Sequence, residues 1–111
     1  MAIVPALLTA SVQLGATAAS IYTTPAQGQT LIKRAVFTNV DTSPRTITVH
    51  RVPVSGSASN ANRVISSFRL SPGQSYVAVE LANMVLNAGD SIQAFADTAN
   101  LVNVTMSGFA L

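Results

Sequence analysis

The sequence predicts an all-β fold, a single antiparallel β-sandwich or jelly-roll-like domain of about eight strands that spans residues 1–111. Apolar and hydroxyl residues alternate along much of the chain, which is the two-residue period of a strand with one buried face. Turn sequences built on proline or glycine separate the alternating runs. The length of 111 residues fits one core, and a hydrophobic fraction of 49% excludes a disordered chain.

The first three strands are expected at residues 8–14, 19–24 and 29–40. In the first run the apolar side chains are expected to face the core and the polar ones solvent, because they alternate as Leu8, Thr9, Ala10, Ser11, Val12, Gln13 and Leu14. A turn at residues 25–28 separates the second and third runs. The third run carries apolar residues on both parities, so both of its faces are expected to be partly covered.

The fourth strand is expected at residues 46–51, paired with the third as a hairpin across the break at residues 41–44. His50 alternates with Val49 there, so we expect it on the solvent face, where its mutation is benign. Residues 55–62 read SGSASNAN and form the longest loop. This composition is typical of a solvated, mobile connector, and the alternative is a contact loop that orders on docking.

The remaining strands are expected at residues 63–70, 76–81, 92–96 and 101–109, with a short apolar stretch at residues 84–86. Ser71, Pro72 and Gly73 predict a type II turn, because proline fixes one central residue and glycine accepts a positive φ at the next. A further turn is expected at residues 87–90. The last run has the cleanest alternation in the chain.

The side-chain inventory argues against catalysis, since the sequence has no cysteine, no tryptophan, one histidine and only four carboxylates. We expect no catalytic residues, no metal site and no cofactor, because these need several convergent donors, acids or bases. The six basic residues are dispersed and not clustered with aromatics, so nucleic acid is not an expected partner. The uncharged first 32 residues are interrupted by polar residues and proline, so neither a signal peptide nor a membrane segment is expected.

Three segments are the expected partner contacts. The apolar residues 1–7 predict a contact arm, and residues 55–62 a partner-facing loop. Two arginines of like parity in one strand predict a face for an anionic partner, or else edge residues that discourage unwanted pairing. The individual contact residues are Ile3, Val4, Leu7, Leu8, Ser55, Gly56, Ser57, Asn60, Asn62, Arg63 and Arg69.

Residues 31–53, LIKRAVFTNVDTSPRTITVHRVP, resemble a recurrent signature of short phage and prophage virion proteins. The likeness continues through residues 61–65, 70–76, 80–81 and 86–94. Arg34 and Arg51 depart from it, because that pattern often has smaller or apolar residues there. The resemblance implies a small β module in the virion, assembled in the host cytoplasm, either as a head decoration or cement protein or as a tail accessory. Its implied partner is the major capsid protein or another virion protein.

Few charges and many small side chains also favour packing against copies of the same chain, so we expect a homo-oligomer, a trimer ahead of a dimer. The competing hypothesis is a tail-associated receptor- or carbohydrate-binding module. Sugar sites usually provide an aromatic platform, and Tyr22 and Tyr76 supply a poor one. A small secreted or periplasmic domain is a third alternative. We therefore expect a noncatalytic virion protein, with capsid decoration ahead of a tail location.

Overall fold

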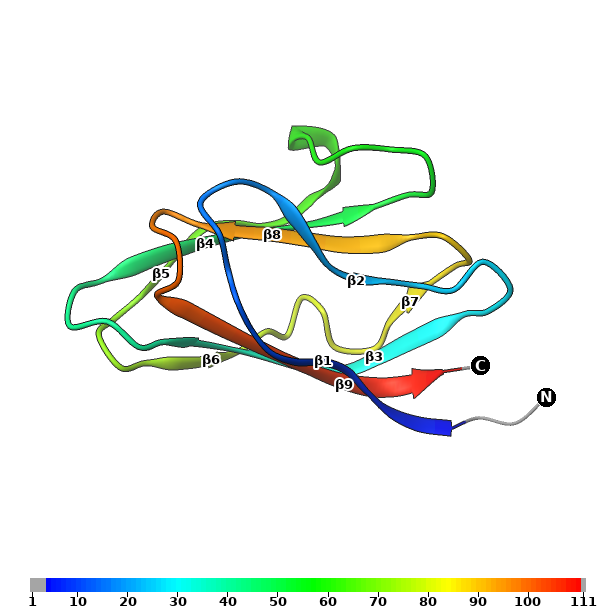
Figure 1. Cartoon of the computed structure of the whole chain (residues 1–111), viewed down its shortest axis with the longest axis horizontal. Coiled ribbons are helices and arrows are strands. Elements are labelled where there is room, and N and C mark those ends of the chain that lie inside the picture. Colours follow the sequence, from blue (N-terminus) through cyan, green and yellow to red (C-terminus); the bar gives the residue numbers. More distant parts are fainter. Residues whose placement is uncertain (1–3, 111) are drawn as a thin grey trace.

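The computed structural model describes residues 4–110, and these form two antiparallel sheets that face each other (Figure 1). The strands are β1 (Val4–Gln13), β2 (Ala19–Thr23), β3 (Thr30–Asn39), β4 (Arg45–Val52), β5 (Arg63–Leu70), β6 (Ser75–Val77), β7 (Met84–Leu86), β8 (Ser91–Ala96) and β9 (Val102–Ala110). Sheet A has the order β1-β9-β3-β6, with β7 paired to the other end of β3, and sheet B has the order β2-β8-β4-β5. The all-β sandwich prediction is confirmed.

The core lies between the two sheets and is built from the inward side chains of their central strands. Phe37, Val104 and Met106 of sheet A and Ile47 and Val49 of sheet B are fully or almost fully buried. In β9 the buried side chains alternate with exposed or half-buried ones, as the sequence pattern predicts. One hydrophobic cluster therefore holds both sheets together.

The predicted turns form where proline and glycine place them. Gly73 has a φ of +72°, and the amide of Gln74 donates to the carbonyl of Ser71 at 3.0 Å, which confirms the type II turn. Gly89, with a φ of +84°, forms the turn at residues 87–90 in the same way.

Two contacts close the open sides of the sandwich. Phe68 of β5 and Tyr76 of β6 stack across the sheets with 4.2 Å between their ring centroids. On the opposite side, the Thr9 hydroxyl of β1 donates to the carbonyl of Ile21 in β2 at 2.9 Å.

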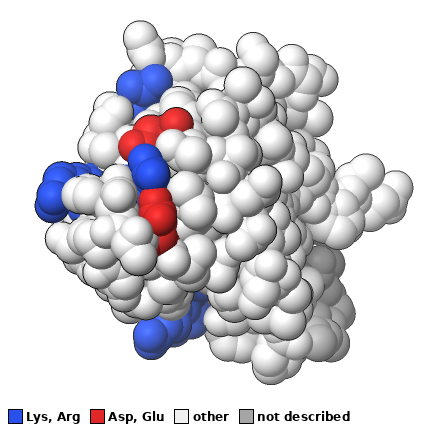
Figure 2. All heavy atoms as spheres, turned by 60° about the vertical axis from the view of Figure 1, so that its left-hand side comes forward, with Lys and Arg blue, Asp and Glu red and all other residues white. Residues whose placement is uncertain are grey.

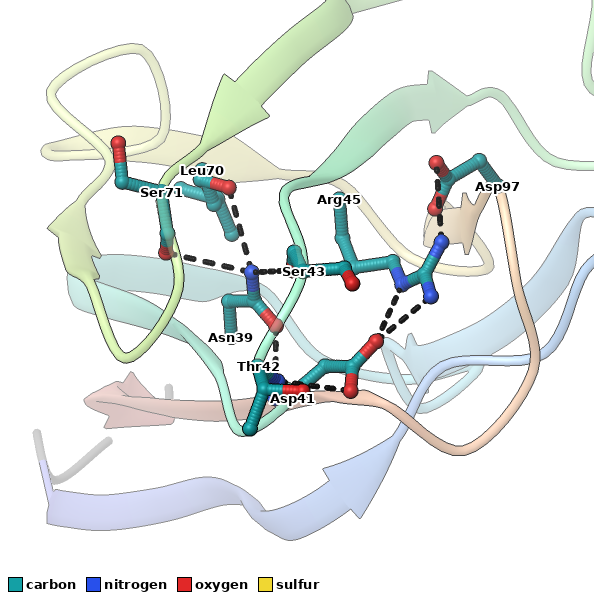
Figure 3. Close-up of polar contacts among 8 residues, drawn as sticks. All are labelled: Asn39, Asp41, Thr42, Ser43, Arg45, Leu70, Ser71 and Asp97. Carbon is teal, nitrogen blue, oxygen red and sulfur yellow. Dashed lines mark hydrogen bonds and ion pairs between the residues drawn. The ribbon is translucent and has the colours of Figure 1, made fainter.

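A buried asparagine organises one end of the sandwich (Figure 3). The side-chain Nδ2 of Asn39 donates to the backbone carbonyls of Ser43, Leu70 and Ser71. The side-chain Oδ1 of Asn39 accepts from the backbone amide of Asp41 at 2.9 Å. It thereby joins the β3–β4 loop to the β5–β6 turn.

An ion-pair group lies beside Asn39 at the same end of the sandwich. Arg45 contacts Asp41 at 2.6 Å and Asp97 at 3.8 Å. The hydrogen bond from Arg45 and the bond from the Thr42 amide hold the pKa of the Asp41 carboxyl below its usual value. This end is therefore tied by buried and half-buried polar contacts.

The strand β1 differs from its predicted pattern. Register shifts against β9 fall between Leu7 and Thr9 and between Thr9 and Val12, and Ser11 has a φ of +44°. Each shift reverses which side chains face the core. Thr9 is consequently buried and Ala10 exposed, so the expectation that the whole apolar set faces inward is wrong here. Val12, which pairs with buried Val104 after the second shift, is still 40% exposed on the edge strand.

A pH-dependent prediction follows from the Tyr76 hydroxyl, which donates to Glu80 at 2.6 Å. This hydrogen bond raises the pKa of Tyr76 to about 12, because it stabilises the neutral phenol beside a carboxylate. The folded-state pKa lies above the unfolded value of about 10, so the stabilisation is present below pH ~10 and is lost as pH rises through ~12. In a Tyr22→Phe background, ultraviolet absorbance should show Tyr76 ionising near pH 12. Adding Glu80→Gln should lower that midpoint, and an unchanged midpoint would contradict the assignment.

Candidate partner-binding surface

One end of the outer face of sheet A carries exposed apolar side chains in a row. The strand register places Pro5 opposite Phe109, Phe109 opposite Leu31 and Leu31 opposite Val85, so the row crosses β1, β9, β3 and β7. Pro5 is exposed and Val85 is 49% exposed, while Phe109 and Leu31 are half-buried. We call these four residues the apolar row. Contiguous exposed apolar surface of this kind is typical of an interaction site.

An open groove of about 430 Å³ lies beside this row. Pro5, Ala6 and Leu7 of β1 form one wall, Lys33 of β3 forms the other, and residues 107–109 of β9 form the floor. Leu7 is 64% exposed at the wall. The far end of the same face is polar, because Gln13, Asn103, Thr38 and Ser75 share one register row there. The apolar row therefore lies at the end of the face where β1 begins and β9 ends (Figure 1), whereas the pair of half-buried Val36 and exposed Val77 lies nearer the polar end.

A β-bulge in β3 places two charged side chains at this end of the face. Ile32 pairs with Gly108 and Arg34 with Ser107, so Lys33 is the extra residue. Ala35 and Ile32 are buried, whereas Lys33 and Arg34 are both exposed. The bulge thus places two consecutive cations toward solvent beside the groove.

Gly108 makes the bulge sterically feasible. A Cβ at position 108 would overlap the carbonyl oxygen of Leu31 and would lie 3.0 Å from the Lys33 amide nitrogen. Only a residue without a side chain permits the two backbones to approach this closely.

The cations beside the groove have no carboxylate partner within the described part of the chain. Lys33 donates to the side-chain oxygen of Asn83 at 3.3 Å, and Arg34 makes no ion pair. The four carboxylates are engaged elsewhere: Asp41 and Asp97 with Arg45, Asp90 with Arg51, and Glu80 with Tyr76. Figure 2 shows, on one face of the molecule, that the basic and acidic side chains form small groups on a largely uncharged surface.

The predicted contact arm is only partly described. Ile3 lies outside the described residues, and Val4 pairs with Ala110 at the start of β1. Residues 4–7 are therefore part of an edge strand of sheet A and not a free arm. Leu7 is exposed at the groove, whereas Leu8 is half-buried and packs against the core. The contact role of these residues stays a prediction.

The loop over residues 55–62 is more organised than its composition predicts. Its end forms the 3-10 turn η1 (Asn60–Asn62), and Ser59 and Asn62 bond each other's backbone in a capping box. The side-chain Nδ2 of Asn62 also donates to the carbonyl of Ser57 at 2.8 Å. The predicted contact residues Ser55, Gly56, Ser57 and Asn60 are exposed, while Asn62 is half-buried.

His50 corrects one sequence prediction, because it is 2% exposed and not on an open solvent face. Its Nδ1 lies 3.0 Å from both the Ser59 carbonyl and the Asn62 side-chain oxygen, so it carries the proton and donates to them. Its ring stacks with Phe95, with 6.2 Å between the ring centroids. The loop covers His50, which ties it to sheet B.

The two predicted strand arginines lie on the outer face of sheet B. Arg63 is opposite His50 and Arg69 is opposite Thr46, two positions on the same side of β4. Arg63 donates to the Ser66 hydroxyl at 3.2 Å and Arg69 to the Ser71 hydroxyl at 3.4 Å. They share a face, as predicted, and their partner role stays a prediction.

Within residues 4–110, the carboxylates and His50 form no group of three that could hold a metal ion. No helix in this part of the chain has the length and apolar character to cross a membrane.

Comparison with known proteins adds information about the fold. No family model matches the chain, and no curated protein matches it. A chain in the structure of the infectious bursal disease virus Gx strain aligns with a TM-score of 0.57 and 10% identity, over 98% of this chain and 32% of that chain. This chain therefore spans about a third of that viral protein.

A second solved structure is that of Bacillus endospore appendages, described as disulfide-linked pili. It aligns with a TM-score of 0.53 and 18% identity, over 97% of this chain and 86% of that chain. The three proteins share a fold. At these identities the likeness concerns architecture, and both matches agree with an all-β sandwich.

The bulge can be tested with Gly108→Ala. We expect a loss of about 3 kcal/mol in the free energy of unfolding, because the new methyl overlaps the β3 backbone and not a flexible side chain. Gly15→Ala is the matched control, since a Cβ there has its nearest neighbour at 3.9 Å. Urea denaturation followed by circular dichroism measures both variants. Equal midpoints would show that the close approach at Gly108 does not exist.

The buried position of His50 predicts that its side chain contributes to the stability of the fold. His50→Ala should lower the free energy of unfolding by about 2 kcal/mol, because it leaves a cavity and removes the donor to two loop oxygens. Asn60→Ala in the exposed part of the same loop should change it by less than about 0.5 kcal/mol. Urea denaturation midpoints compare the two variants. An unchanged midpoint for His50→Ala would show that the residue is dispensable for stability, as the sequence pattern predicted.

Proposed function

We propose that the chain is a noncatalytic structural protein of a virus particle, and that it decorates or cements a phage capsid as a homo-oligomer. The observation that carries this proposal is the exposed apolar end of sheet A, formed by the apolar row and Leu7. A face of this kind is suited to binding another protein surface.

Two further arguments support a particle role. The sandwich fold is shared with a chain from a virus structure, and residues 31–53 resemble short phage virion proteins. The location would be the virion, with the major capsid protein as the first partner and a tail position as the alternative.

The mechanism would be mass action. A protein that binds the assembled shell and not its separated subunits lowers the free energy of the assembled state by RT ln(1 + L/Kd) per site, where L is its free concentration. Copies arranged around a symmetry axis each contribute the same modest contact, so several weak contacts become one strong attachment. We favour a trimer over a dimer in this arrangement.

A second candidate is a filament subunit. The pilus chain matches along 86% of its length, so its size and this chain's size are similar. A disulfide-linked filament is excluded for this sequence, because it has no cysteine. A filament of these subunits would depend on noncovalent contacts alone.

The test compares phage particles from the cells that encode the chain with particles from a strain in which its gene is deleted. Gold-labelled antibody against the purified protein should mark heads on the first particles and not on the second. Particles without the chain should lose their genome at a lower temperature. Tail labelling would favour the alternative location. Unlabelled particles, or filaments formed by the purified protein in electron micrographs, would overturn the capsid proposal.

A further inference from the structure

Resting on the proposed function, we infer that the groove beside the apolar row binds an extended segment of a different virion protein, one that carries apolar side chains and a carboxylate. The shape of the groove and its positive charge both favour such a segment, and the charge disfavours a second copy of this chain.

The shape fits an extended chain. The walls are the β1 edge strand and the β3 bulge, and the floor is the β9 backbone at Ser107 and Gly108. Pro5, Leu7 and Phe109 offer apolar contacts along the length of the groove, so a partner with alternate apolar side chains can bury them here.

The charge selects a carboxylate. Lys33 lines the groove and Arg34 follows it in the bulge, and no Asp or Glu lines the same groove. Beside exposed apolar surface, a carboxylate on the partner would gain an ion pair while its neighbours exclude water. A basic partner segment would meet two like charges.

A second copy of this chain is a poorer occupant. If two copies met through the same face, the cations Lys33 and Arg34 of both copies would lie in one interface, and no carboxylate lines the groove to pair with them. If another face of a second copy entered the groove, its carboxylate would have to leave Arg45, Arg51 or Tyr76. The homo-oligomer contacts are therefore expected on another surface.

The test uses a display library of random seven-residue peptides selected on the purified protein. We expect the enriched peptides to carry at least one Asp or Glu together with apolar residues. The double variant Lys33→Glu with Arg34→Glu should weaken their binding by about tenfold or more, and higher salt should weaken it for the unmodified protein. Leu7→Ser should also weaken it.

Arg69→Glu is the matched control, because it reverses one exposed charge on the opposite sheet and should leave peptide binding within about twofold. Equal urea midpoints establish that all variants are folded. The inference is wrong if no peptide is enriched, if the enriched peptides lack an acid, or if the double variant binds them equally. It is also wrong if phosphatidylglycerol vesicles or single-stranded DNA bind in a Lys33-dependent manner and peptides do not.

Adding purified protein back to particles that lack it separates this inference from the proposed function. If unmodified protein and the double variant decorate these particles equally, the groove inference fails and the virion role stands. If neither decorates them but peptides still bind through Lys33, the virion role fails and the peptide-binding groove stands.

Discussion

The outer face of sheet A depends on how closely the backbones of β3 and β9 approach each other at Gly108. The absence of a side chain at that position lets Lys33 bulge out of the ladder. The bulge changes the parity of β3, so Ile32 joins Ala35 and Phe37 in the core while two cations remain at the surface. Packing inside the sandwich and charge outside it therefore have the same origin. A change at this one glycine would disturb both.

Much of the fold could be predicted from the sequence. The alternation in β9 and the turn at Gly73 are local properties, and both appear in the structure as expected. The parity of β1 and β3 could not be predicted, because bulges arise from the fit between partner strands and not from one strand's own pattern. The short β7 was visible only as an apolar stretch, and the strand expected at residues 76–81 ends at Val77 because the chain turns to bury Leu81.

The binding surface was predictable only in part. Leu7 was a candidate because the first residues are apolar, and it does line the groove. Its companions Leu31, Val85 and Phe109 lie far from it in sequence and meet through strand register alone. His50 shows the same limit, since the loop that buries it returns over the sheet by tertiary contacts. The fold thus forms surfaces that cannot be predicted from any single segment of the sequence.

The pairing of Val4 with Ala110 puts the two ends of the described chain side by side in sheet A, next to the groove (Figure 1). An affinity tag or fluorescent protein joined at either end would emerge at the pole that carries the apolar row and would obstruct it. Residues 16–18 are exposed in the loop between β1 and β2, at the opposite end of β1 from this pole. Cargo inserted there would leave that pole accessible, so this loop is the better position for displaying foreign sequences.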